Sequence, residues 1–416
     1  MLRPLALAAA LAAALALPGL AGPASAQTFS TLDQDARAAV LDVVAMGRGG
    51  AVAALPTPDS PFFSNPAHMA GTQRLGFTII GATAGVGGNV RETYDFYDQT
   101  LGPAIEEGLD DIRRSNPDRL QVIYDEAFRI GTSQKTADIA AFAPSARMRF
   151  GTVAVGLGVF GAGTARAKIS DGGAGIPFID LYSQADVLVP LTVATIVPGL
   201  PFRLDAGASA TYLQRRLTAK AEAVDALDPD NEKVYLFSGT GIRLGFGLDA
   251  HDVGTPGLDV GLALTNVGSA LDMEYDDSIR IEAPENAPDD AAEIARLESR
   301  FDGRGSASAF RLGAAYHVPF SAPGLSDLTV AADYTSASTS EFDQSFQAGL
   351  RGGATATLGG ALAVSLGLSQ GMPSAGIGVS TRFVRIDYAT FGVEDGRLLG
   401  QQGRRNHAVN LRIGLF

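Results

Sequence analysis

From about residue 146 to the C-terminus, apolar side chains alternate with charged, polar or glycine residues. In the segment from Phe202 to Tyr212 the even positions are apolar, whereas the odd positions include Arg203 and Asp205. A period of two is typical of β-strands whose two faces meet different environments. Roughly 12 to 16 such segments, many about ten residues long and separated by turn residues, form the pattern of an outer-membrane barrel.

The number of alternating segments distinguishes a closed barrel from a soluble β-sandwich. A sandwich of that many strands is unusually large, whereas a barrel has no sheet edges and satisfies every backbone group in lipid. No segment after the N-terminus has the ~20 uncharged apolar residues that a membrane helix needs. We therefore predict an all-β fold, a closed antiparallel transmembrane β-barrel of about 14 strands formed by residues 73–416.

The first 26 residues have the features of an export signal. Arg3 precedes an apolar run from Leu5 to Leu17, and Ala24-Ser25-Ala26 supplies the small residues that a signal peptidase requires. We expect cleavage before Gln27 and export to the outer membrane of a Gram-negative bacterium.

Residues 27–72 predict short helical segments ahead of the barrel. Apolar residues from Leu32 to Val43 recur at helical spacing and stop at the glycines of residues 47–50. Asn65 is a preferred N-cap residue, and Pro66 suits a first helical position because its missing N–H has no partner there. The sequence therefore predicts a short helix that begins at Pro66.

Residues 93–139 predict an amphipathic helical hairpin inserted between strands. Its second helix runs from Pro117 to Ile130, with Asn116 as the cap and Gly131 as the stop. We expect the apolar stripe of the first helix to pack against the protein's own barrel, with a partner protein as the alternative. The stripe consists of Leu101, Ile105, Leu109 and Ile112.

Residues 272–302 form the most acidic stretch, with eleven acidic residues against three arginines. Barrels of this kind keep short turns on the periplasmic side and long loops outside, so we expect an extracellular loop. A short helix is expected within it, at residues 289–300.

Composition narrows the class of protein further. The chain has 50 glycines, no tryptophan and no cysteine, so it has neither disulfides nor the lipidated cysteine of a lipoprotein. A net charge of −13 argues against nucleic acid as a partner.

Catalytic and cofactor chemistry find little support in the sequence. The four histidines are scattered and form no HExxH pattern, so we expect no enzyme, no catalytic residue, no metal and no cofactor. An outer-membrane hydrolase would need Ser, His and a carboxylate on one side of the barrel, and strand parity gives no such cluster. Gly156 to Gly161 match GxGxxG, but the segment alternates as a strand and lacks a βαβ setting.

Charged residues on the polar face of the strands are expected to face the lumen. They line a selective channel, or they form paired charges that fill and rigidify the barrel. We favour the paired network, because the signs are mixed and no ring of one sign appears. The set is Arg203, Asp205, Arg243, Asp249, Arg311, Asp333, Arg385 and Asp387.

Several short motifs resemble one known superfamily, the FadL-like outer-membrane proteins, which includes hydrophobic-compound channels, the PorV and PorQ proteins and the TraF-like proteins. The opening glycine-rich stretch and the Asn-Pro-Ala turn resemble its plug, which implies that residues 27–72 plug the barrel. The hairpin insertion looks more like the TraF-like branch. Phe416 resembles the terminal residue that barrel assembly machinery recognises, although its parity differs from the strand's apolar face. The motifs are Gly47–Ala51, Ser64–Ala67, Thr265–Gly268, Asp333-Tyr334 and Ile386–Ala389.

The resemblance implies uptake or binding of a small hydrophobic molecule, with the plug residues as either a gate or a structural turn. The alternative is a non-transporting PorV-like or TraF-like envelope protein that acts in secretion or as a scaffold. Expected partners are outer-membrane lipid, the barrel assembly machinery, and either a hydrophobic molecule or secretion proteins. The ligand-binding candidates are Phe62, Phe63, Asn65, Pro66 and Met69.

Overall fold

The computed structural model describes most of the chain from residue 42 onward. The described ranges are 42–88, 90–131, 135–171, 177–223, 233–268, 271, 273–280, 291–301, 308–319, 322, 324–337, 349–394 and 403–415. The expected signal peptide at residues 1–26, the helical pattern that starts at Leu32, and Phe416 lie outside these described residues.

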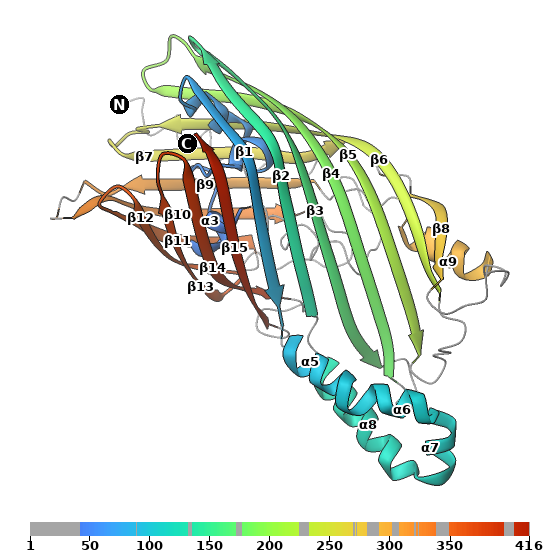
Figure 1. The fold of residues 1–416 in the computed structure, drawn as a ribbon. Coiled ribbons are helices and arrows are strands. Elements are labelled where there is room, and N and C mark those ends of the chain that lie inside the picture. Colours follow the sequence, from blue (N-terminus) through green and yellow to red (C-terminus); the bar gives the residue numbers. More distant parts are fainter. Residues whose placement is uncertain are drawn as a thin grey trace.

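The described strands form one antiparallel sheet, and 14 of them close into a barrel (Figure 1). The strands are β1 (Leu75–Gly87), β2 (Lys135–Phe150), β3 (Val153–Asp171), β4 (Pro177–Val197), β5 (Arg203–Ala223), β6 (Lys233–His251), β7 (Leu258–Gly268), β8 (Glu274–Arg280), β9 (Ala309–His317), β10 (Leu325–Ala337), β11 (Leu350–Leu358), β12 (Leu362–Ser369), β13 (Met372–Ser380), β14 (Val384–Glu394) and β15 (Gly403–Leu415).

Two pairings complete the ring of strands. β1 pairs with β15, the last strand, and β5 pairs with β6 along most of their lengths. β8 lies outside the ring and extends the sheet from the first residues of β6. The predicted fold class, with about 14 strands, is confirmed.

The described helices belong to the N-terminal segment and to two insertions. They are α3 (Val43–Gly47), α4 (Ser60–Phe63), η2 (Pro66–Gly71), α5 (Val90–Phe96), η3 (Tyr97–Leu101), α6 (Gly102–Glu107), α7 (Leu109–Ser115), α8 (Pro117–Gly131) and α9 (Ala291–Phe301). Within the described residues, none of these helices is long and apolar enough to cross a membrane.

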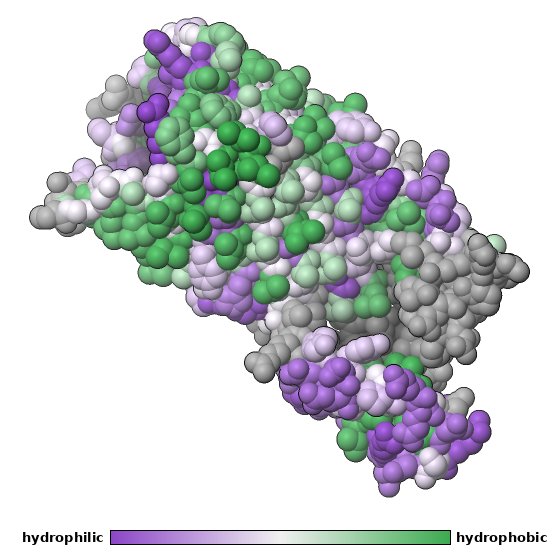
Figure 2. Space-filling view, in the orientation of Figure 1, coloured by the Kyte–Doolittle hydropathy of each residue, from purple (hydrophilic) through white to green (hydrophobic). Residues whose placement is uncertain are grey.

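The outer face of the barrel is apolar, as the alternation predicts. Leu191 on β4, Leu366 on β12 and Ile413 on β15 are all exposed on the outside of the wall. Figure 2 shows hydrophobic side chains covering the flank of the barrel, whereas hydrophilic ones cover the helices at the far end. Such a surface is stable against lipid, and the closed ladder satisfies the backbone groups there.

The two ends of the barrel differ. Short turns at residues 151–152, 198–202 and 381–383 lie at the end where β15 finishes, and helices α5–α8 project from the opposite end (Figure 1). The wall is also uneven, because β4 and β5 have 21 residues each whereas β12 has eight. The turn from β12 to β13 is closed by Gln370 and Gly371, both with positive φ, as in a tight type I′ hairpin.

Residues 42–72 lie inside the barrel and form its plug. Val43 and Met46 of α3 pack against Phe391 and Val393 of β14. Helix η2 contacts β4, β5 and β6 on the other side of the lumen. The plug therefore contacts the wall on both sides of the lumen, toward the end that carries the short turns.

Helices α5–α8 form an arm with a core of its own. Leu101, Leu109 and Ile112 of the apolar stripe are buried against Leu120 and Tyr124 of α8. The expectation that this stripe packs on the barrel is therefore wrong, because the two apolar faces of the hairpin cover each other. Helix α8 begins after Asn116, whose side-chain oxygen accepts from Arg119 N–H at 3.2 Å, as predicted.

Two boundaries of the insertions differ from those expected. Residues 135–139 belong to β2 and not to the hairpin. Residues 274–280 of the acidic segment form a strand, β8, although a loop was expected. β6 extends beyond β7, and β8 pairs with the edge of β6 that β7 leaves free. The expected short helix is confirmed as α9.

Candidate functional site

Asn65 holds the turn before η2 and fastens it to the wall. Its Oδ1 accepts a hydrogen bond from the backbone N–H of Ala67 at 3.1 Å, which confirms the predicted cap. Its Nδ2 donates to the carbonyl of Ala53 at 2.7 Å and to that of Leu248 on β6 at 3.2 Å. One buried side chain therefore caps a helix and joins the plug to the barrel.

Glycines on the inner face of the wall make room for this turn. A Cβ atom at Gly207 would lie 2.4 Å from the carbonyl carbon of Pro66, and one at Gly247 would lie 2.0 Å from Asn65 Oδ1. A Cβ atom at Gly156, the first glycine of the GxGxxG match, would lie 2.2 Å from Met69 Cε. These glycines allow close approach of the plug.

Charged side chains from three separate strands hold the plug. The carboxylate of Asp333 on β10 accepts from the N–H groups of Val52 at 2.5 Å and Ala53 at 2.6 Å. Arg412 on β15 forms a buried ion pair with Asp59, in which Nη1 and Oδ1 are 2.7 Å apart. Arg147 on β2 donates to the carbonyl of Pro58, and because hydrogen bonds to charged groups are the stronger ones, the plug is fixed from several sides.

Arg48 organises the interior of the plug. Its Nε donates to the carbonyl of Ala51 at 2.7 Å, and its Nη2 donates to the carbonyl of Leu55. Burial lowers the pKa of Arg48 to about 10, with Asp42 and Asp333 acting against that effect. The guanidinium therefore stays charged at neutral pH and satisfies the carbonyls of a loop that has no ladder of its own.

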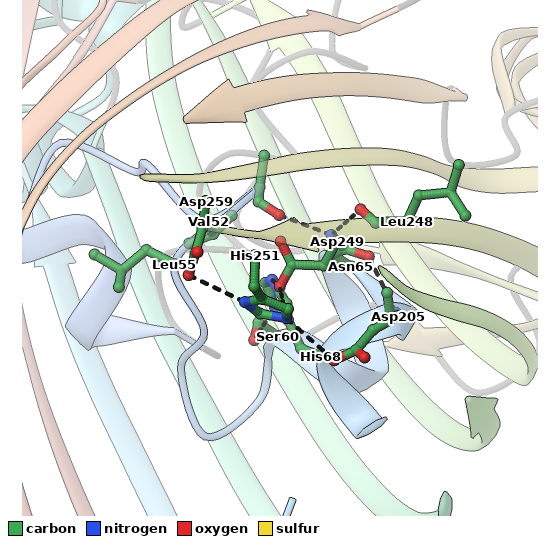
Figure 3. A network of polar contacts seen from close by, with 12 residues as sticks. Val52, Leu55, Ser60, Asn65, His68, Asp205, Leu248, Asp249, His251 and Asp259 are labelled. Carbon is green, nitrogen blue, oxygen red and sulfur yellow. Dashed lines mark hydrogen bonds and ion pairs between the residues drawn. The ribbon is translucent and has the colours of Figure 1, made fainter. Parts of the chain in front are cut away.

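A second polar cluster joins the plug to β5 and β6 (Figure 3). His251, at the end of β6, has Nδ1 3.1 Å from a carboxylate oxygen of Asp259 and Nε2 3.2 Å from one of Asp205. Asp249 Oδ2 lies 3.6 Å from the Nε2 atoms of both His251 and His68. Two histidines that are far apart in the sequence therefore meet at one carboxylate.

Ser60, His68 and Asp249 also bring together the residue types of a hydrolase, which corrects the sequence-based expectation that no such cluster exists. Ser60 Oγ lies 2.8 Å from His68 Nδ1, but the same hydroxyl donates to the carbonyl of Thr57 at 3.1 Å. The Ser60 side chain is 0% exposed, so a substrate cannot reach it as a nucleophile. Within the described residues no group of His, Cys, Asp or Glu is arranged to hold a metal.

Aromatic side chains cover the inner side of the plug. Phe62 and Phe63 lie with their ring centroids 5.4 and 4.9 Å from that of Phe160 on β3. Met69 is fully buried in the same cluster. Of the expected ligand-binding residues, Phe62, Phe63 and Met69 therefore share one apolar surface, while Asn65 and Pro66 face the wall of β5 and β6.

This apolar cluster continues along the inner wall to the opposite mouth of the barrel. Leu213 and Leu217 of β5 lie between, and the ring of Tyr275 on β8 meets that of Phe237 at 6.0 Å. Leu297 of α9 is buried in the same cluster. Buried apolar contacts therefore extend from the acidic insertion to the plug, with the ion pair of Arg215 and Asp186 lying beside them.

The eight charges expected in the lumen do not form one lining. Arg203 pairs with Asp205 at 2.7 Å and Arg385 with Asp387 at 2.8 Å, each two residues apart on one strand. Asp249 and Asp333 face the plug, and Arg311 lies beside Asp333 on the neighbouring strand. Arg243 is half-buried on β6.

Sequence reasoning missed several residues of the plug contacts. The sequence around these residues does not indicate their contacts, because their partners are up to 353 residues away. They are Arg48, Asp59, His68, Arg147 and Arg412. The glycine-rich opening and the Asn-Pro-Ala turn pointed to this region, and they did so through the resemblance. Gly49 and Gly50 there have φ of +80° and +83°, a conformation that favours glycine.

Comparison with known proteins gives structural similarities at low sequence identity. No family model matches the chain, and no curated protein matches it. A toluene transporter of Ralstonia pickettii, TbuX, is 13% identical, with 90% of this chain and 98% of that one covered and a TM-score of 0.45. The Pseudomonas putida toluene transporter TodX is 12% identical (89% and 96% covered, TM-score 0.47), and a Pseudomonas aeruginosa FadL homologue is 11% identical (89% and 97%, TM-score 0.43).

Proposed function

We propose that this protein is an outer-membrane barrel that takes up or binds a small hydrophobic molecule. The observation that carries the proposal is the cluster of buried apolar side chains that runs along the inner wall from Tyr275 at the mouth to Phe62 of the plug. A general aqueous pore has a polar lumen, so a connected apolar lining favours an apolar ligand. In this proposal the partly buried Phe63 contacts the ligand, the buried Phe62 and Met69 support it from beneath, and Asn65 and Pro66 fix the turn that carries them.

The proposal includes a location and a route of assembly. Residues 1–26 direct export, the barrel assembly machinery inserts the chain, and lipid surrounds the outer face. The short-turn end, which the plug closes, faces the periplasm, and the arm α5–α8 faces outward. The polar surface of the arm supports this orientation, because it lies beyond the apolar flank of the barrel (Figure 2).

A fluorescent fatty acid tests the proposal on the refolded barrel. Phe160→Ala removes the ring that touches Phe62 and Phe63, and we expect a loss of affinity of about tenfold or more, since a buried Phe contributes ~1.5–3 kcal/mol. Phe150→Ala is the matched control, because Phe150 is 62% exposed on the outer face. Equal affinities of the two variants, or no saturable binding to the wild type, would rule out this ligand class.

One observation favours a second function, that of a PorV-like or TraF-like scaffold. The arm has its own core and still exposes Tyr94 and Tyr97, which suits contact with another protein. In that case the folded wild type binds no fatty acid, and removal of the arm abolishes co-purification of an envelope protein while the barrel remains folded.

A further inference from the structure

Three of the four histidines lie in one row with aspartates along five neighbouring strands. His317 at the end of β9 lies 3.7 Å from Asp259 on β7 and 3.7 Å from Asp327 on β10. Asp259 contacts His251, and the row continues through Asp249 to His68 of the plug. Because the His317 side chain is 43% exposed and that of His68 is 0% exposed, the row leads from the solvent-facing rim to the plug contact.

The inner end of this row contains two polar atoms without a hydrogen bond. Among the described residues, His68 Nε2 and Asp249 Oδ1 are both buried and have no hydrogen-bond partner. Asp249 Oδ2 is 3.6 Å from that Nε2. Ser60 Oγ lies 2.8 Å from His68 Nδ1 and 3.1 Å from the carbonyl oxygen of Thr57, and its one hydrogen bonds to only one of these atoms. In the tautomer in which that hydrogen goes to Thr57, Nδ1 carries the imidazole hydrogen and Nε2 presents a lone pair to the carboxylate.

The charges around Asp249 do not balance without a further proton. Both ring nitrogens of His251 lie at hydrogen-bond distance from carboxylates, so this ring donates twice and is a cation. His251 and Arg203 then face three carboxylates, those of Asp205, Asp249 and Asp259. One negative charge of this group is left, because Arg48, which also lies near His68, faces the carboxylates of Asp42 and Asp333. Burial of an unpaired charge is costly.

We propose that His68 and Asp249 form an internal proton-binding site, in which one proton held by the pair keeps the plug against β6. The proton neutralises the charge of Asp249, whose Oδ2 lies 3.6 Å from His68 Nε2. This inference goes beyond the proposed function, because it concerns the docking of the plug whatever the barrel carries.

The groups that face His68 determine how docking depends on pH. They are Arg48 from the plug, Asp249 and His251 from β6, and Asp205 from β5. Burial, followed by the nearby charge of Arg48, lowers the pKa of His68 to about 3 from its ordinary value of 6.5. The docked pair therefore takes no second proton in mild acid.

The direction in which docking changes with pH follows from the number of protons bound in the docked and undocked states. Above pH 6.5 the docked pair holds one proton and the undocked His68 holds none, so docking weakens as the pH rises. Below pH 6.5 the undocked imidazole holds a proton as well, so docking is constant there. The expected loss is about tenfold in the docking equilibrium for each pH unit, until the docked pair itself loses its proton.

A cysteine in the plug measures docking, since the natural chain has none. Ser64→Cys is nearly isosteric, and Ser64 is buried at 7% exposure. We would label it with a maleimide from pH 5 to 9 and divide the native rate by that of the unfolded protein at the same pH, which removes the titration of the thiol itself. Ala361→Cys, in an exposed turn, reports any general change of the barrel.

We expect the accessibility of Ser64→Cys to be constant up to about pH 6.5 and to rise roughly tenfold per unit above it. In the Asp249→Asn variant the amide group still donates toward His68 but does not titrate. The accessibility of the cysteine at position 64 therefore stays low up to pH 9. His68→Gln also loses the pH response. His407→Gln retains it, because His407 stacks on Tyr388 outside the row.

A flat wild-type profile, or a full pH response in Asp249→Asn, would overturn the proposal. The wild-type profile needs no variant of the site, so misfolding of His68→Gln leaves the test intact. Fatty acid binding is measured separately, and its absence would reject the hydrophobic-ligand proposal without changing the labelling result.

Discussion

At the scale of single residues, the inner wall of this barrel has glycines where the plug packs closely against it. Gly207, Gly247 and Gly261 lie where any side chain would meet the plug backbone or Asn65. The abundance of glycine pointed to a barrel, but only the packed plug shows why these strands carry it. Close packing of this kind makes the addition of one methyl group measurable.

Gly247→Ala tests this close packing. The new methyl group would overlap Asn65 Oδ1, and we expect destabilisation by about 1–3 kcal/mol, measured as a lower midpoint of heat-modifiable migration. Gly161→Ala on β3 is the control, because its Cβ would lie 3.8 Å from the nearest atom, the carbonyl oxygen of Ala141. Equal midpoints for the two variants would show that the plug does not press on β6.

At the scale of elements, the amphipathic patterns identified the helices but did not identify the surfaces against which the helices pack. The stripe of α6 and α7 needs an apolar neighbour, and the sequence does not state whether this is the barrel or α8. The structure places α8 there, because the hairpin turn at Asn116 returns the chain antiparallel at short range. Short sequence separation makes this pairing the one with the smaller loop entropy.

Ile112→Ala tests the independence of the arm. Ile112 is fully buried between α7 and α8, so the cavity should destabilise the arm by about 2–5 kcal/mol. Limited proteolysis should then cut the arm faster, while heat-modifiable migration of the barrel stays unchanged. Val122→Ala, at a site 66% exposed on α8, should show neither effect, and a change in barrel migration for Ile112→Ala would mean that arm and barrel fold as one unit.

At the scale of the whole molecule, charge and apolar surface are separated. Residues 90–131 contain ten acidic residues and five arginines, and residues 272–302 contain eleven and three. These net charges of −5 and −8 together account for the −13 of the chain, so the remainder is neutral. A neutral barrel with paired interior charges suits a membrane, where unpaired charge is costly.

Removal of residues 42–72 tests whether the plug is separable from the wall. The ring of hydrogen-bonded strands closes without it, so we expect the variant to keep heat-modifiable migration, at a lower midpoint. In planar bilayers the variant should show steady conductance, and the intact protein should not, because residues 42–72 contact the wall on both sides of the lumen. Steady conductance of the intact protein would place an open path beside the plug.

The sequence by itself determined the barrel, its approximate strand number, the plug turn at Asn65, helix α8 and the presence of α9. These depend on periodicity and on contacts within a few residues, which are local in the chain. Only the tertiary structure decided that Asp59 meets Arg412, that Asp333 holds Val52 and Ala53, and that His68 joins His251 at Asp249. Such contacts depend on strand register around a closed ring, and each joins residues more than 150 positions apart, where no local pattern records the partner.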